Sequence, residues 1–300
     1  MAKKRSAMMN KLSIAIIGAG KVGSALGILL QQKGYAVAAV ASRTKESAQQ
    51  LSRRLNCPVL SNQEAAARAE LVFITTPDRS ISPVAAEIAK AGGFRPGQVV
   101  THTSGAHAAG ELQGVREAGA LAVSIHPLQS FAEVRAAMEN LPGSYFALEG
   151  DESALPLARQ VVEDLNGKWF TISAADKPVY HAAACIASNY LVSLMHFATG
   201  LYAKFGLGPK EAFEALYPLV QGTVANITKV GPTGALTGPV ARGDAPTIAG
   251  HMKAFQELDP QLRELYSLLG QYTIKVALEK GSINQEQSKE LTQILMHKGV

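Results

Sequence analysis

The glycines that follow the first apolar run of the chain have the spacing of a phosphate-binding turn. Gly18-Ala19-Gly20-Lys21-Val22-Gly23 comes after the apolar residues 14–17 and opens an amphipathic stretch, 24–32. In a G-x-G-x-x-G turn the first glycine permits a tight bend, the second lets backbone amides approach a diphosphate, and the third lets helix and strand pack closely. The positive end of the helix then stabilises the anion. We expect Gly18, Gly20, Lys21, Val22 and Gly23 to bind a dinucleotide; the alternative is a glycine-rich turn without a ligand.

The residues after the second apolar run indicate which dinucleotide is bound. An Asp or Glu at this place would accept a hydrogen bond from the ribose 2′-hydroxyl and repel a 2′-phosphate. The chain instead has Ala41-Ser42-Arg43-Thr44, and the Ser42 hydroxyl and the Arg43 guanidinium suit a phosphate. We therefore predict NADP(H) rather than NAD(H). The alternative is that Arg43 only begins a solvated helix.

Polar residues also follow the later apolar runs, where the ends of parallel strands would gather around a ligand. Those expected near the cofactor are Thr75, Thr76, Pro77 and Thr103. Ser104 is expected to orient a substrate. His126 is the first candidate for moving the proton that accompanies hydride transfer, because a histidine with a near-neutral pKa can donate or accept one. A structural histidine is the alternative for His126, and it is the favoured interpretation of His102.

Lys177, His181, Cys185 and Asn189 recur every fourth residue and so share one side of a helix. Asn189 is expected to hold a substrate oxygen, and His181 to line the same cleft or bond a neighbouring loop; both could instead satisfy a domain interface. Cys185 is interpreted as a small buried hydrophobe. Further along, Asp244 is predicted to be a helix N-cap.

The elements that would position these residues change type along the chain. Short apolar runs alternate with Ala-rich amphipathic segments as far as residue 173, which is typical of parallel α/β sheets. The predicted strands are residues 13–17, 36–41, 59–60, 71–75, 99–103, 120–125, 145–148 and 169–172. Only helical periodicity follows. We predict a disordered basic tail (1–11), a Rossmann-like, doubly wound, mostly parallel α/β domain (12–173) and an all-α substrate and dimerisation domain (174–300).

Composition excludes several classes of protein. The chain has 300 residues, of which 47% are hydrophobic and 18% charged, and four of its five net positive charges lie among residues 1–11. No basic stripe for nucleic acid remains, and the two cysteines give neither a disulfide framework nor metal-ligand spacing. Residues 182–203 carry no charge, but their Ser, Asn, His and Thr residues favour a buried central helix over a membrane span. We expect a cytoplasmic protein without a metal.

The motifs GAGKVGSAL, ASR, HTSGA, SIHPLQSF, HAAACIASNYLVSL and ALTGPVARGD occur in this order over nearly the whole chain. Together they resemble the predicted short-subunit dehydrogenase-like proteins, in which a Rossmann-like NADP-binding domain precedes a helical domain of unknown function. The arrangement is more distantly similar to ketopantoate reductase, pyrroline-5-carboxylate reductase and the β-hydroxyacid dehydrogenases. In the last group a helix supplies a Lys and an Asn; Asn189 matches the Asn, but no lysine stands at the corresponding position. The His126-Pro127 pair resembles the catalytic His-Pro of prephenate dehydrogenases.

These observations lead to one expected function. The chain should be an NADP-dependent oxidoreductase that transfers a hydride between nicotinamide and a small keto/hydroxy or imino acid in an interdomain cleft. The resemblance implies a homodimer formed through the helical domain. The alternatives are a non-catalytic NADP(H)-binding sensor or scaffold, which the missing lysine keeps open, and a dehydrogenase that uses NAD.

Overall fold

The computed structural model describes residues 11–297. The chain divides into two compact units, Met1–Asn189 and Tyr190–Val300, and each is described by itself. Most of the predicted basic tail lies outside the described residues. Lys11, which we had included in that tail, forms an ion pair with Asp164 (2.7 Å) and lies over the ring of Tyr35.

The first unit is built on a seven-stranded sheet with the order β2-β1-β3-β4-β5-β6-β7. The strands are β1 (Ser13–Ile17), β2 (Ala36–Ala41), β3 (Leu71–Ile74), β4 (Val99–His102), β5 (Leu121–Pro127), β6 (Tyr145–Gly150) and β7 (Lys168–Thr171). Strands β1 to β5 are parallel, β6 is antiparallel to β5, and β7 is parallel to β6. The prediction of a doubly wound, mostly parallel sheet is confirmed.

The predicted strand at residues 59–60 is reduced to a single parallel bridge between Val59 and Val40. Two backbone bonds hold it there, from Val40 N to Pro58 O and from Leu60 N to Val40 O, each 3.0 Å long. If this bridge is counted as a strand, the order at this edge becomes the 3-2-1-4 order of Rossmann sheets. The prediction placed the segment correctly and overestimated its length.

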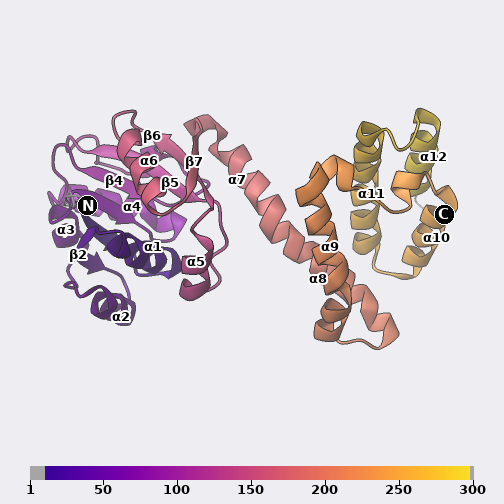
Figure 1. The fold of residues 1–300 in the computed structure, drawn as a ribbon, viewed down its shortest axis with the longest axis horizontal. Coiled ribbons are helices and arrows are strands. Elements are labelled where there is room, and N and C mark those ends of the chain that lie inside the picture. Colours follow the sequence, from indigo (N-terminus) through magenta and orange to yellow (C-terminus); the bar gives the residue numbers. More distant parts are fainter. Residues whose placement is uncertain (1–10, 298–300) are drawn as a thin grey trace, which may run out of the picture. The chain divides into compact units, whose positions relative to one another are not determined.

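Helices cover both faces of the sheet (Figure 1). They are α1 (Lys21–Gln32), α2 (Lys45–Leu55), α3 (Asn62–Ala67), α4 (Ile81–Lys90), α5 (Val134–Asn140) and α6 (Leu155–Asp164), with the short turns η1 (Asp78–Ser80), η2 (Ala109–Glu111) and η3 (Ala174–Asp176). Helix α7 (Lys177–Cys185) begins beside the sheet and leads away from it (Figure 1). Successive residues of a strand point to opposite faces. Ile16 therefore packs with α1, α2, α5 and α6, whereas Ile17 packs with α3, α4 and η2.

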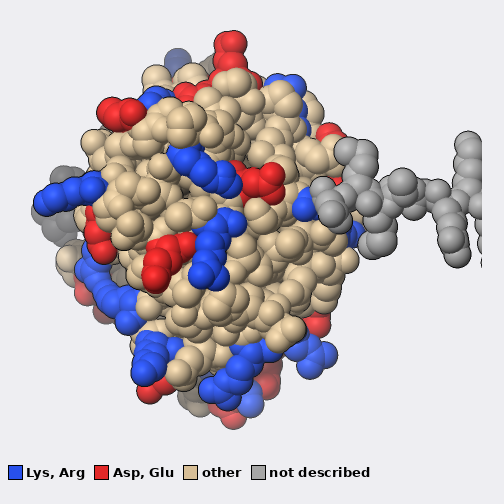
Figure 2. All heavy atoms as spheres, turned by 90° about the vertical axis from the view of Figure 1, so that its left-hand side faces the viewer, with Lys and Arg blue, Asp and Glu red and all other residues tan. Residues whose placement is uncertain are grey.

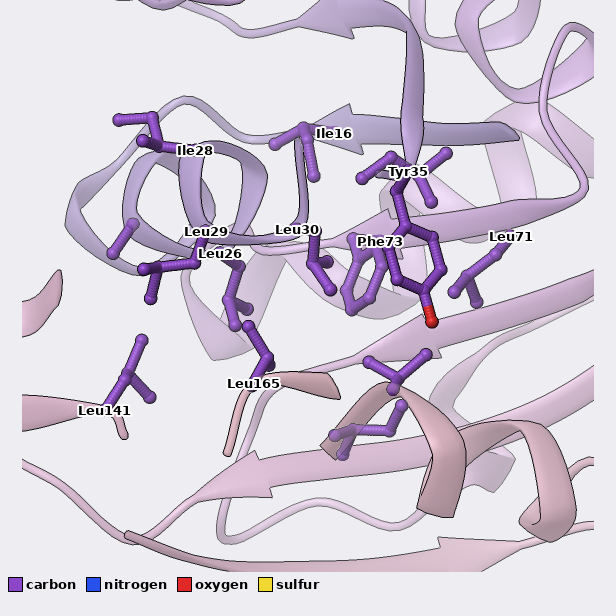
Figure 3. Packing of buried hydrophobic residues seen from close by; sticks show 14 of the residues in the cluster. Ile16, Leu26, Ile28, Leu29, Leu30, Tyr35, Leu71, Phe73, Leu141 and Leu165 are labelled. Carbon is purple, nitrogen blue, oxygen red and sulfur yellow. The ribbon is translucent and has the colours of Figure 1, made fainter. Parts of the chain in front are cut away.

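The first of these two cores is centred on β1 and β3. Leu26 and Leu30 of α1 lie against Ile16 and Phe73, and all four side chains are almost completely buried (Figure 3). Burial of a large apolar side chain contributes about 1.5–3 kcal/mol. This packing fixes α1, and with it the glycine turn, against the sheet.

The described part of the second unit is entirely helical, as predicted. It contains α8 (Leu191–Leu201), η5 (Tyr202–Phe205), α9 (Pro209–Ala235), η6 (Val240–Arg242), α10 (Ala245–Ala254), η7 (Phe255–Glu257), α11 (Pro260–Lys280) and α12 (Gln285–Met296). Its core joins η6, α10, α11 and α12. Asp244 accepts a bond from Thr247 N and caps α10, which confirms the predicted N-cap.

The uncharged segment 182–203 is not the buried helix that we expected. Within the described chain, the helical stretch Ala174–Phe205 is long and apolar enough to cross a membrane by length and composition alone, yet only 6% of its most apolar window is buried. Large apolar side chains such as Ile186 and Val192 are exposed. The expectation was wrong because an apolar pattern does not show whether the covering surface belongs to the same chain.

Charges of both signs are mixed over the part of the surface shown in Figure 2. Lys and Arg side chains lie beside Asp and Glu side chains, with apolar and neutral residues between them. A surface for nucleic acid needs a stripe of one sign. The face in Figure 2 does not have one.

Candidate functional site

A cavity of about 630 Å³ lies at the carboxyl ends of β1, β2 and β3. This edge includes the point where the strand order reverses, which is where ligands bind in open α/β sheets. The predicted cofactor residues that line it are Gly18, Gly20, Ser42, Arg43, Thr75, Thr76 and Pro77. Lys21, Val22, Gly23 and Thr103 do not line it. Among the lining residues that the sequence did not single out are Thr44, Ser47, Ser61, Asn62 and Ser80.

The three glycines of the turn differ in the space around them. Gly18 has a φ of 113° and touches the Thr75–Thr76 backbone, so the bend requires glycine. A Cβ at Gly23 would overlap Gly18 O and Thr75 Oγ1, whereas a Cβ at Gly20 would meet nothing within 4 Å. Two glycines therefore serve the packing of the turn, and the third keeps one side of it open.

The open side of the turn suits an anion. Gly20 is the N-cap of α1, it has no side chain to cap the helix, and the first turn of the helix contains no acid. The first N–H groups of a helix lack partners within the helix and carry a partial positive charge. Nearby, the buried Thr76 hydroxyl has no hydrogen-bond partner among the described residues. The diphosphate of a dinucleotide would satisfy these donors.

The end of β2 brings a cation and hydroxyl groups to the same cavity. β2 ends at Ala41, and Ser42, Arg43 and Thr44 follow it along the cavity wall. The acid among the lining residues is Glu87, which comes from α4 and not from β2. These residues fit a nucleotide with a 2′-phosphate.

Polar side chains gather at a second place, between β4, β5 and α7. Ser104 is their centre: its N–H donates to His102 Nδ1 (3.1 Å), and its hydroxyl donates to Asp78 Oδ2 (2.9 Å). The same hydroxyl accepts from the N–H groups of Ala106 (3.3 Å) and His107 (3.2 Å). Ser104 is buried. Its hydroxyl, which we expected to contact a substrate, is engaged inside the turn.

Asp78 connects the two places. It follows Pro77, which lines the cavity, and its carboxylate accepts the hydroxyl of Ser104. The nucleotide cavity and the second cluster therefore belong to one continuous structure within the first unit.

Lys177, the first residue of α7, enters the second cluster from the other side. Its ammonium donates to Ser104 O (3.0 Å) and to Ser124 Oγ (2.5 Å), and only 1% of the residue is exposed. Burial lowers the pKa of Lys177 to about 8, and the charges of Glu149 and Asp78 oppose that decrease. The group therefore remains mostly protonated at pH 7.

His126 lies near the carboxyl end of β5, as predicted. Its Nδ1 is 2.6 Å from the hydroxyl of Tyr180. The pKa of His126 is lowered to about 4, mainly by burial and next by the charge of Lys177. We had expected a pKa near neutrality, so the structure corrects this point: His126 is a neutral imidazole at physiological pH.

His102 has the structural role that the sequence favoured. Its ring nitrogens bond Ala108 O (3.1 Å) and Ser104 N, and the side chain is completely buried. Burial lowers its pKa to about 4. His102 is thus a neutral side chain whose two hydrogen bonds stabilise the turn after β4.

His181 lies close to His126. The two rings are edge-to-face with centroids 6.2 Å apart, and a Cβ at Gly105 would be 2.7 Å from both His126 Nε2 and His181 Nδ1. His181 Nδ1 is buried without a hydrogen-bond partner among the described residues, and Nε2 is 3.6 Å from Cys185 Sγ. Asn189 is exposed in the π-helical turn Ile186–Tyr190, two helical turns further on.

The reversed direction of β6 explains why α7 contributes to this cluster. β7 is the edge strand and runs antiparallel to β5; its last residue, Thr171, is level with Ile125 of β5, so α7 begins near that level and runs in the direction of β5. The three helical residues from Lys177 to Tyr180 rise about 4.5 Å, and the two strand residues from Ser124 to His126 rise about 6.6 Å, a difference that the side chains can span. Lys177 consequently meets Ser124, and Tyr180 meets His126. The four-residue pattern in the sequence included Lys177 and His181 but missed Tyr180.

Two family models match the sequence. Residues 2–127 match a Rossmann-like domain, and residues 144–273 match a domain of unknown function, DUF2520. No curated protein matches the chain. The second match begins before β6, whereas the compact units divide after Asn189 and our predicted boundary followed residue 173.

Solved structures share the fold over most of the chain. A Bacteroides fragilis protein to which NADP oxidoreductase activity is ascribed is 22% identical, with a TM-score of 0.71 over 89% of this chain and 99% of that one. Protein TM1727 from Thermotoga maritima is 28% identical, with the same coverage and TM-score. A Plasmodium falciparum pyrroline carboxylate reductase solved with NADP bound is 15% identical, with a TM-score of 0.56 over 95% and 99% of the two chains. The chain thus joins a Rossmann-like domain to the domain of unknown function DUF2520.

Proposed function

We propose that the protein is an NADP-dependent oxidoreductase that acts on a small keto/hydroxy or imino acid. Support for the cofactor comes from the open amide end of α1 at Gly20, the unpartnered hydroxyl of Thr76, and Arg43 at the end of β2. The amides at Gly20 and the Thr76 hydroxyl would hold the diphosphate, and Arg43 would hold the 2′-phosphate. When bound, NADP(H) supplies or accepts the hydride.

The observation that carries the reaction type is the neutral imidazole of His126, whose Nε2 lies against Gly105; the neighbouring Ser104 binds Asp78, which follows the cavity residue Pro77. We assign its proton to Nε2, because Tyr180 can then donate its O–H to Nδ1. Burial raises the pKa of Tyr180 to about 12, so this hydroxyl keeps its proton. The N–H at Nε2 is suited to polarise a carbonyl or imine during reduction.

The low pKa of His126 also determines how it handles protons. A histidine with a pKa of about 4 does not store a proton at pH 7. During reduction Nε2 gives its proton to the substrate oxygen or nitrogen while Nδ1 takes the proton of the Tyr180 hydroxyl, which water then replaces. During oxidation the tautomer with its proton on Nδ1 accepts the proton of the hydroxyl or amine at Nε2, and the imidazolium then releases a proton to water. We propose that Asn189 holds a substrate oxygen and that His181 lines the same site.

Calorimetry followed by a turnover screen tests this proposal. We expect NADPH to bind more tightly than NADH, and NADPH to be oxidised by at least one small keto acid, imine or aldehyde. His126→Gln should keep NADPH binding within about twofold and lower turnover by about 10²–10⁴-fold. His297→Gln, an exposed histidine in the second unit, is the matched control.

Each result discriminates between functions. Tight NADPH binding without turnover on any substrate would favour an NADP(H) sensor or scaffold. Absence of binding to either nucleotide would refute the proposal. Full turnover by both His126→Ala and Asn189→Ala would refute the assigned roles.

We further propose a cytoplasmic homodimer; exposed apolar side chains of the second unit support the association. Large apolar side chains are exposed on α9 and α11, among them Leu219, Val230, Leu268 and Tyr272. Exposed apolar surfaces of this kind mark association sites. A second copy of the chain, joined through the helical unit, would cover them.

A further inference from the structure

Lys177 has no part in the hydride transfer proposed above, yet it is the most deeply buried charged residue of the described chain. Taking an ammonium out of water costs several kcal/mol unless partners compensate for it. Its partners are a backbone carbonyl and a hydroxyl, Ser104 O and Ser124 Oγ. The buried ammonium of Lys177 is therefore expected to have a role other than filling space in the core.

The first consequence of these bonds is mechanical. Ser104 O accepts from both Lys177 and Ser124 (3.3 Å), while the Ser104 hydroxyl binds Asp78 on the opposite side. The turn after β4 is thus held between α7 and η1. The next residue, Gly105, lies directly against His126 Nε2 and His181 Nδ1. Movement of this turn would move the surface on which both imidazoles rest.

The second consequence is electrostatic. The groups that face His126 come from β4, η1 and α7, and they are His102, Asp78, Lys177, Tyr180 and His181. Burial is the main cause of its low pKa; the charge of Lys177 comes next and acts in the same direction, whereas Asp78 opposes it. Lys177 is therefore the largest charged contribution to the neutrality of His126.

We propose that Lys177 is a positioning residue that clamps the Ser104–Gly105 turn against β5 and so holds the surface on which the imidazole of His126 rests. This inference deepens the proposed function, because it concerns the same imidazole. Lys177 itself need not touch the substrate. Glu149, which is buried and bound to Ala109 N (2.7 Å), supplies the opposite charge that keeps the ammonium protonated.

Two substitutions separate the clamp from the charge. Lys177→Met removes both, whereas Lys177→Gln removes the charge and keeps a donor for Ser104 O. Lys90→Met removes an exposed lysine at the end of α4 and is the matched control. Histidine ring resonances are followed by NMR from pH 5 to pH 8, with the signal of His126 identified from His126→Gln.

In the native protein we expect His126 to stay neutral throughout this range. Both Lys177 variants should raise its pKa by about one unit, so that titration becomes visible below pH 6. The His107 N–H donates to the Ser104 hydroxyl, so the turn protects it from hydrogen exchange with solvent. This exchange should become about tenfold faster in Lys177→Met and change less in Lys177→Gln. NADPH affinity should stay within about twofold, because the residues that line the nucleotide cavity fall within residues 17–87.

An unchanged His126 titration in both variants would overturn the electrostatic part, and unchanged His107 exchange in Lys177→Met would overturn the clamp. If Lys177→Met does not fold, Lys177→Gln still tests the charge. The NMR titration needs no nucleotide or substrate. Its failure is therefore distinct from failure of the proposed function, which calorimetry on the native protein reveals.

Discussion

Gly20→Ala should remove nucleotide binding while leaving the fold intact. Gly20 has a φ of −80° and a ψ of −170°, which alanine adopts without strain, and an added Cβ would meet no atom within 4 Å. The remaining cost is that of alanine at an N-cap, at most about 1 kcal/mol. The methyl group would, however, stand where the diphosphate must approach the amides of α1. We expect at least a tenfold loss of NADPH affinity, equivalent to about 1.4 kcal/mol.

Gly23→Ala provides the contrast. Its Cβ would overlap Gly18 O and Thr75 Oγ1, which are fixed by the sheet. Overpacking of a rigid site costs about 1–3 kcal/mol or more. This variant should therefore lose stability first, and lose binding only as a consequence of a displaced turn.

Urea denaturation and calorimetry of both variants check this reasoning. Gly20→Ala should unfold within about 1 kcal/mol of the native protein and bind NADPH weakly, whereas Gly23→Ala should unfold at clearly lower urea. Native-like NADPH affinity in Gly20→Ala would refute the assignment of the open side of the turn to the diphosphate.

Three further predictions concern other parts of the molecule. Arg43→Ala should weaken NADPH binding about 10–100-fold, the value of one or two charge-assisted bonds, and leave NADH binding within about twofold, as measured by calorimetry; equal losses for both nucleotides would contradict the assigned 2′-phosphate contact. Because the pKa of Lys177 is lowered from 10.5 to about 8, the native state binds fewer protons than the unfolded chain between these values. This group alone should therefore raise the free energy of unfolding by about 3 kcal/mol as pH increases from 8 to 10.5. Urea denaturation at pH 7 and pH 10 should show this increase in the native protein and not in Lys177→Met; the same change of unfolding free energy in both proteins would exclude it. Leu219→Glu, at a side chain that is 68% exposed, should shift a dimer to monomer in light scattering without lowering the melting temperature; a native protein that is monomeric at all concentrations would exclude the dimer.

The local features of the nucleotide cavity could be predicted from the sequence. The strands β1 and β2 begin and end where their apolar residues do, and the space around each glycine of the turn is the space that its position implies. Both depend on contacts between near neighbours in the chain. The absence of an acid after β2 could likewise be read directly, because the turn that follows a parallel strand lies at a known edge of the sheet.

The second cluster could be predicted only in part. His126 and Ser104 were found because they follow strands, but the bonds that define their states come from Lys177, Tyr180 and Asp78, at separations of 26 to 73 residues. The pKa of His126 depends on burial by these distant segments. Similarly, the exposure of segment 182–203 depends on which surfaces cover it, which periodicity does not specify.

The antiparallel step at β6 has a consequence for how this fold could diversify. The residues that line the cavity fall within 17–87, while the imidazole cluster is built from residues within 78–185, so the two stretches overlap only from Asp78 to Glu87. Under the proposed function, a recombination event just before Asp78 would exchange the glycine turn and the residues after β2 and leave the imidazole cluster in place. Conversely, changes in α7 could alter the reaction without disturbing the nucleotide. Because the two groups of residues follow one another along the chain, changes in cofactor choice could be inherited independently of changes in the reaction.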